Sequence, residues 1–82
     1  MTLDEIQTLK GQTIILRKLV FLGSNPNQDK EHLVMKVLEK SVMIDNRRSK
    51  VFVPMQFFLQ ERSKLITEKG KPIVYIPYWF NY

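Results

Sequence analysis

The chain has 82 residues, a net charge of +5, one histidine and no cysteine. This length fits one domain, residues 1–82. Without cysteine there is no disulfide or thiolate chemistry, and a lone histidine excludes a histidine-rich metal cage. We therefore expect neither a bound metal nor another cofactor.

Two features of the sequence bear on location. The first residues lack the basic and apolar runs of a signal peptide. No segment reaches the ~18–20 uncharged apolar residues that cross a bilayer. The sequence therefore predicts a small cytoplasmic domain that has no membrane partner.

The first predicted element is a short amphipathic helix over residues 2–10. Thr2 and Glu5 have the spacing of a capping box, in which each side chain bonds to the other residue's backbone. Apolar residues recur every three positions, as on one face of a helix. Gly11 follows as a typical C-terminal stop.

Two strands and a loop are predicted next. Residues 12–22 are rich in β-branched and apolar side chains, and the polar segment 23–29 reads as a loop. Residues 31–45 fit either an amphipathic helix or an alternating strand. The apolar pattern continues through Ile44, which favours a strand over residues 32–45.

A turn, a strand, a helix and a last strand complete the chain. The turn covers residues 45–49, and the strand covers residues 50–53. Pro54 suits a helix start, and an apolar stripe extends this helix over residues 54–66. The final strand is expected at about 72–77. The sequence thus predicts an α+β domain with an antiparallel β-meander, built as a small barrel or as a sheet with a helix.

The positive charge is unevenly distributed. Residues 1–9 hold two acids and no base, so the remainder carries a surplus of seven positive charges. Two predicted turns hold much of this surplus, one around Arg47 and Arg48 and one around Lys69 and Lys71. Clustered positive charge favours binding to polyanions, and it also serves solubility alone in many small domains.

The aromatic residues are concentrated at the C-terminus. Five of the nine aromatic side chains fall within the last eight residues. These rings either pack on the core, pair in a strand, or contact a partner, and the sequence leaves these alternatives open.

Catalytic motifs are missing from the sequence. His32 is the only imidazole, and we expect a surface or capping role for it rather than a catalytic one. No carboxylate spacing matches a two-metal or zinc motif, and the glycines are too isolated for a phosphate-binding loop. The sequence therefore predicts a binding protein and not an enzyme.

Basic residues near aromatic rings favour a module that binds single-stranded DNA or RNA, since phosphates take the charge and bases stack on the rings. The two basic turns, and the first strand if the last one packs beside it, would contact phosphate. The C-terminal aromatics would stack. The predicted binding residues are Arg17, Lys18, Arg47, Arg48, Lys50, Lys69, Lys71, Tyr75, Tyr78 and Trp79.

An alternative hypothesis is a small accessory or inhibitory subunit. Tyr and Trp are typical interface anchors, so the aromatic end could dock on a larger protein, for example one of a replication or other nucleic-acid complex. An exposed last strand could also pair with a partner's sheet or with a second copy of the chain.

Overall fold

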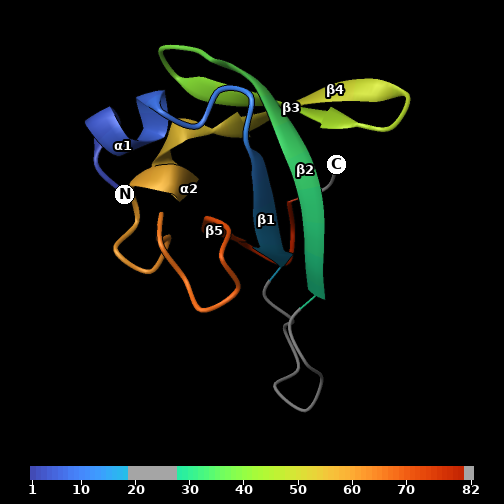
Figure 1. The fold of residues 1–82 in the computed structure, drawn as a ribbon. Coiled ribbons are helices and arrows are strands. Elements are labelled where there is room, and N and C mark those ends of the chain that lie inside the picture. The colour runs from blue at the N-terminus through green and yellow to red at the C-terminus, as the bar shows by residue number, and fades with distance from the viewer. Residues whose placement is uncertain (19–27, 81–82) are drawn as a thin grey trace.

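The computed structural model describes residues 1–18 and 28–80, which form two short helices and five strands. The expected α+β class is confirmed, and in the described ranges no helix is long and apolar enough to cross a membrane. In chain order the elements are α1 (Leu3–Gln7), β1 (Thr13–Lys18), β2 (Gln28–Val37), β3 (Ser41–Asn46), β4 (Ser49–Pro54), α2 (Met55–Leu59) and β5 (Ile73–Ile76) (Figure 1).

The strands form one mixed sheet in the order β4-β3-β2-β1-β5. The first four strands are antiparallel neighbours in chain order, so the expected meander is confirmed in part: it has four strands where three were predicted. β5 runs parallel to β1, with Arg17 opposite Tyr75. A parallel return needs a crossover connection, which α2 and the segment after it supply.

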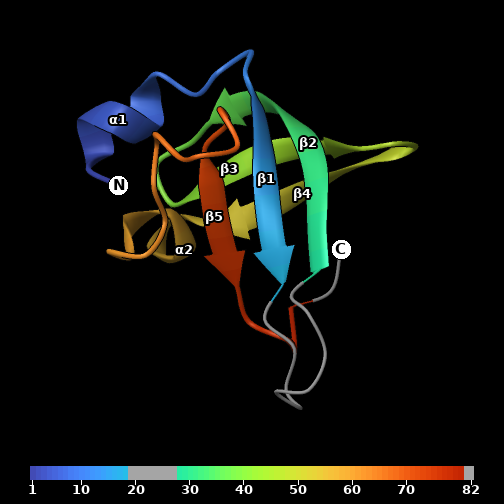
Figure 2. The same ribbon diagram turned by 60° about the horizontal axis from the view of Figure 1, so that its bottom comes forward.

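β2 belongs to both halves of the sheet. Its residues 28–33 pair with β1, whereas residues 34–37 pair with β3. The register shifts between Val34 and Lys36, and such a bulge bends a strand and increases its twist. Figure 2 shows β5, β1 and β2 side by side, with β3 and β4 crossing behind them. The bend turns the β3–β4 hairpin away from the other strands.

The hydrophobic core lies against one face of this bent sheet. Ile14 and Leu16 of β1 point into it, so the alternation of the strand places Arg17 on the opposite face. Phe58 of α2 and Ile6 of α1 are fully buried in the same cluster. The two helices are therefore held by packing, since helices of five residues are not stable alone.

The expected capping box of α1 is confirmed. The Thr2 N–H donates to Glu5 Oε1 at 2.8 Å, and the Glu5 N–H donates to Thr2 Oγ1 at 3.2 Å. The hydrogen bond from the Thr2 backbone is the main cause that lowers the pKa of Glu5. The helix ends at Gln7, earlier than expected, because residues 8–11 form a turn in which Thr8 Oγ1 donates to Glu5 O at 2.6 Å.

The strand expected over residues 32–45 is in fact two strands, β2 and β3, so this prediction was wrong in its extent. Glu39 and Lys40 form the turn between them, where the Leu38 N–H donates to Ser41 O at 2.8 Å. Apolar residues stand on both sides of this turn, so the pattern does not reveal it. The choice of strand over helix is confirmed for this segment.

β2 begins earlier than expected. Gln28 and Asp29, predicted in the loop 23–29, are the first residues of this strand and pair with the end of β1. The predicted strand 12–22 is seen as β1, and its residues 19–22 lie outside the described residues, as does the loop segment 23–27.

The helix predicted over residues 54–66 ends at Leu59, so this prediction was also wrong. Gln60 is extended, with φ −63° and ψ 146°. Its side chain donates to Phe57 O at 2.9 Å and to Tyr75 O at 3.0 Å, which ties the segment to β5. Ile66, placed on the apolar stripe by the helical pattern, is 88% exposed. Hydrogen bonding to β5 therefore outweighs continuation of the helix.

Candidate functional site

Five charged side chains form a paired cluster at the β5 end of the sheet: Arg17, Asp29, Glu31, Lys69 and Lys71. Arg17 donates to both carboxylate oxygens of Asp29, at 2.9 and 3.0 Å. Lys69 Nζ adds a third contact to Asp29 at 2.6 Å, and Lys71 pairs with Glu31. Three of the predicted phosphate-binding residues are thus compensated by carboxylates of the same chain.

The Arg17–Asp29 pair is electrostatically tight. Hydrogen bonds from Arg17 are the main cause that lowers the pKa of Asp29, to about 2. The same bonds to Asp29, followed by the bond to Tyr75, raise the pKa of Arg17. Both groups therefore stay charged at neutral pH, and a phosphate must compete with a carboxylate for Arg17.

Tyr75 is engaged by the same cluster. Arg17 Nη1 donates to its hydroxyl at 3.0 Å, and the guanidinium carbon of Arg17 lies 5.5 Å from the ring centroid. Arg62 lies 5.3 Å from the same centroid. The juxtaposition of the first and last strands is therefore confirmed, but it places two guanidinium groups where a base was expected to stack.

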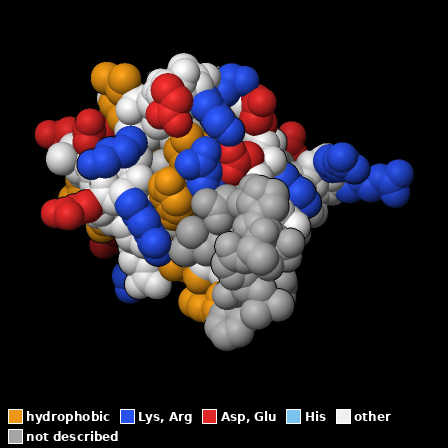
Figure 3. All heavy atoms as spheres, turned by 90° about the horizontal axis from the view of Figure 1, so that it is seen from below, with side chains coloured by type: hydrophobic (Ala, Val, Ile, Leu, Met, Phe, Trp, Pro, Cys, Tyr) orange, Lys and Arg blue, Asp and Glu red, His pale blue; other side chains and the backbone are white. Residues whose placement is uncertain are grey.

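The β3–β4 hairpin carries the other basic group. Arg47 and Arg48 form its two-residue turn, which we call the hairpin tip, and Lys50 follows in β4. All three are exposed, and no carboxylate of the described residues forms an ion pair with them. Figure 3 shows Lys and Arg side chains projecting at one end of the molecule, while over the body such side chains lie beside acidic ones.

The backbone of Arg47 is strained. Its φ is 57°, in the left-handed region that Gly and Asn adopt most readily. Two-residue hairpin turns favour these residues for that reason. An arginine at this position costs stability, and its side chain extends into solvent.

A hollow of about 420 Å³ lies beside this strained residue. Its lining combines the hairpin tip with the first part of β2, through the residues Lys30, Glu31, His32, Asn46 and Arg47. His32 is only 8% exposed, and its Nδ1 lies 3.1 Å from Asp45 O. The expected surface position of this histidine was therefore wrong.

The outward face of the hairpin adds an aromatic residue that the sequence analysis missed. Val51 and Val53 pack toward the core, so Lys50 and Phe52, which alternate with them, point away from it. Phe52 is 55% exposed and stands opposite Met43, which in turn stands opposite Lys36 of β2. The alternation of residues 50–53 was the signal that could have identified Phe52.

The remaining predicted residues are not part of either basic group. Lys18 is half-buried and stands opposite Gln28 and Ile76, on the strand face opposite to Arg17. Tyr78 and Trp79 follow β5 and are 51% and 59% exposed.

The C-terminal aromatic residues divide between surface and core. The Trp79 ring meets the Phe57 ring edge-on, with centroids 6.1 Å apart. Phe80 packs against the core and lies 5.5 Å from the Phe57 ring centroid. Two of the three alternatives are seen: Phe80 packs on the core and Tyr75 pairs in β5. Tyr78 and Trp79 are about half exposed, and contact of these rings with a partner stays a prediction.

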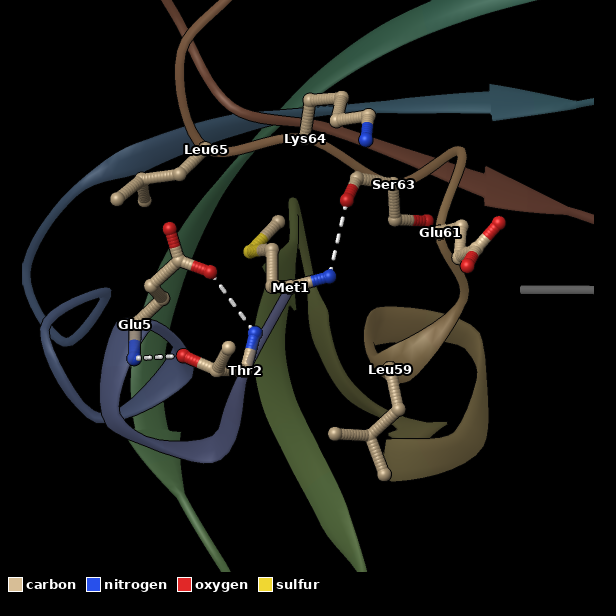
Figure 4. A pocket seen from close by; sticks show the side chains of 8 residues that line it. All are labelled: Met1, Thr2, Glu5, Leu59, Glu61, Ser63, Lys64 and Leu65. Carbon is tan, nitrogen blue, oxygen red and sulfur yellow. Dashed lines mark hydrogen bonds between the residues drawn. The ribbon is translucent and has the colours of Figure 1, made fainter.

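A further cavity, of about 330 Å³, lies where the N-terminus meets the end of α2 (Figure 4). The Met1 ammonium donates to Phe58 O at 2.9 Å, to Gln60 O at 3.2 Å and to Ser63 O at 3.0 Å. These three bonds hold the N-terminus against the end of α2 and the segment that follows it. In the part of the chain that the structure describes, no group of three His, Asp or Glu residues is placed to hold a metal ion.

Comparison of the chain with models of protein families, with curated proteins and with solved structures finds no match. The function is therefore inferred from the geometry of these surfaces.

Proposed function

We propose that this protein binds single-stranded DNA or RNA through the β3–β4 hairpin. The observation that carries the proposal is the hairpin tip, where Arg47 occupies a left-handed conformation that disfavours arginine. Residues that break a local rule at a cost in stability are frequently functional. At this position the Arg47 side chain places its positive charge in solvent, beside Arg48 and Lys50.

Phe52 supplies the second component of a single-strand site. A base that stacks on an exposed ring gains about 1–3 kcal/mol, and any base can do so. Phe52 has Lys50 two residues before it in the same strand, and Lys36 lies across β3 on the same outward face. This arrangement supports phosphate contacts on both sides of a stacked base.

The hollow beside Arg47 lies on the other face of the hairpin. Its lining residue Asn46 shares the face of the buried Ile44 and not that of Phe52, so the hollow is not part of the stacking surface. The paired cluster takes no part in this proposal, because Asp29 and Glu31 already compensate its cations.

The exposure of Tyr78 and Trp79 favours a second candidate function, docking on a larger protein. This surface is separate from the hairpin in the chain and uses no basic residue. Replacement of Trp79 by Ala is therefore expected to leave oligonucleotide affinity unchanged while weakening any complex with a protein partner.

A salt titration tests the nucleic-acid proposal. Binding of a fluorescein-labelled oligothymidylate and of a labelled duplex is measured by anisotropy from low to physiological salt. We expect tighter binding to the single strand, with log affinity falling against log salt by about 0.7 for each phosphate contact. No binding at low salt, or a preference for the duplex, would contradict the proposal.

A matched pair of variants tests the stacking role. Phe52→Ala is expected to weaken single-strand binding by about 5- to 100-fold without changing the salt slope. Leu59→Ala removes an apolar side chain of similar exposure, 44%, from α2 and is expected to change nothing. Equal affinities of both variants would show that Phe52 does not stack on a base.

A further inference from the structure

The outer edge of β5 is closed by the chain itself. The N–H and C=O of Ile73 both bond to Lys64, each at 2.9 Å. The Tyr75 N–H donates to Ser63 Oγ at 3.1 Å, and Tyr75 O accepts from Gln60 Nε2 at 3.0 Å. Along β5 the backbone groups of successive residues point alternately toward β1 and away from it. The Ile15 N–H donates to Pro72 O, so Pro72 points toward β1, and the four groups of Ile73 and Tyr75 point away from it. A partner strand therefore finds no free group here, although β5 is the last strand of the sheet.

The outer edge of β4 is different. The Leu38 N–H donates to Ser41 O, so the backbone groups of Ser41 point toward β2. Backbone direction alternates along a strand, and the backbone groups of Val42, Ile44 and Asn46 therefore point toward β4.

Their partners on β4 are Ser49, Val51 and Val53. The backbone N–H and C=O groups of Lys50 and Phe52 consequently point outward. Nothing in the described residues bonds to these groups from outside the hairpin.

We propose that this β4 edge binds an extended acidic segment of a partner protein as an added strand. An added strand satisfies the outward groups of Lys50 and Phe52 through main-chain hydrogen bonds. The charge at this edge favours an acidic segment. Arg47, Arg48 and Lys50 lie along the edge, whereas the acidic Asp45 stands opposite Lys50 in β3. The segment carries Asp or Glu on the face of Lys50 and apolar side chains on the opposite face, beside Val51 and Val53, as an alternating sequence does.

The same charge disfavours a second copy of this chain. Pairing two β4 strands brings two sets of Arg47, Arg48 and Lys50 together, and lysines on an edge strand are a common protection against self-pairing. The edge is also short, because Pro54 has no N–H and the Met55 N–H already donates to Lys40 O at 2.9 Å. A segment of about four to six residues fits this length.

The proposal does not depend on nucleic-acid binding. A nucleic acid uses the side chains of the hairpin, whereas a strand also needs the backbone N–H of Lys50 and Phe52. The two ligands share cations and are expected to compete.

The test uses the whole chain labelled with nitrogen-15 and a blocked hexapeptide that alternates Glu and Val. We expect the largest amide shifts at Lys50 and Phe52, with slower hydrogen exchange of both amides. The hexapeptide that alternates Lys and Val is the charge control. Shifts spread over the surface without amide protection, equal binding of both peptides, or dimerisation of the protein alone through β4 would overturn the proposal.

Two variants separate the backbone from the charge. Lys50→Pro removes the charge and the outward N–H, and edge strands tolerate proline at such positions. Lys50→Gln removes the charge alone. We expect Lys50→Pro to bind the acidic peptide about two- to tenfold more weakly than Lys50→Gln, and both to bind oligonucleotide equally. If Lys50→Pro does not fold, the exchange measurement on the unaltered chain still decides the proposal.

Discussion

The two ends of the sheet hold similar side chains, which differ in whether the chain itself supplies their partners. At the β5 end, Asp29 and Glu31 pair with the cations, Arg17 and Arg62 cover Tyr75, and the strand edge is closed. At the β4 end the cations have no acidic partner in the described residues, the aromatic ring is exposed and the edge is open. Positive charge and aromatic rings therefore indicate a binding surface only where the chain does not satisfy them itself.

The largest expected change in stability comes from a mutation at the closed edge of β5. Ser63→Ala removes a fully buried hydroxyl that donates to Phe57 O at 2.8 Å and accepts from Tyr75. The Tyr75 N–H loses its partner, so the free energy of unfolding should fall by about 1–3 kcal/mol.

Ser49→Ala at the open end is the matched change, because Ser49 is exposed. We expect it to alter stability by less than about 0.5 kcal/mol. Urea denaturation followed by Trp79 fluorescence measures both variants. Equal losses would mean that the edge of β5 is not closed as described.

The next effect concerns the paired cluster and its dependence on pH. The pKa of Asp29 is about 2 in the folded chain, below the ~4 of a free aspartate. Its ionised form therefore stabilises the fold above about pH 4, and this contribution is lost as the pH falls from about 4 to about 2.

Asp29→Asn lacks this titration. The variant should be less stable than the unaltered chain at neutral pH, by about 1 kcal/mol for a partly exposed pair, and the two should converge toward pH 2. Urea denaturation at a series of pH values measures the difference. A gap that stays constant down to pH 2 would show that the pair does not depend on the ionised carboxylate.

The smallest expected effect is at the hairpin tip. Arg47→Gly relieves the left-handed strain at φ 57° and should raise the free energy of unfolding by about 0.5–1 kcal/mol. Arg48→Gly removes the neighbouring charge at a position without a positive φ, so it should not raise the free energy of unfolding. The thermal midpoints of both variants measure the change in stability. A stabilisation by Arg48→Gly and none by Arg47→Gly would show that Arg47 is not strained.

Much of the fold could be predicted from local patterns. The capping box of α1, the meander and the final strand follow from spacing, alternation and proline positions. The helix after Pro54 was predicted too long, because the apolar spacing beyond Leu59 matches a helix while Gln60 and Ser63 bond to β5. Local patterns do not contain such contacts between distant segments.

The candidate site was predicted only in part. The basic residues of both turns were identified, but the acidic partners of Lys69 and Lys71 lie in β2, far away in the chain. The pairing of Arg17 with Asp29 likewise depends on the β1–β2 register. The exposure of Phe52 depends on which face of β4 packs against the core. Sequence composition counts charges and rings, and only the register shows which of them remain available.

Two double variants compare the hairpin tip with the paired cluster. Arg47→Gln with Arg48→Gln, and Lys69→Gln with Lys71→Gln, each remove two positive charges, the first pair from the hairpin tip and the second from the paired cluster. Affinity for labelled oligothymidylate is measured over a range of salt, with a thermal melt to confirm that both variants fold.

We expect the hairpin variant to lose about tenfold or more in affinity, with a salt slope that falls by about 1.4, while the affinity of the cluster variant changes by less than about threefold. Equal losses in the two variants, or a loss in the cluster variant alone, would contradict the claim that only the unpaired charges serve a partner.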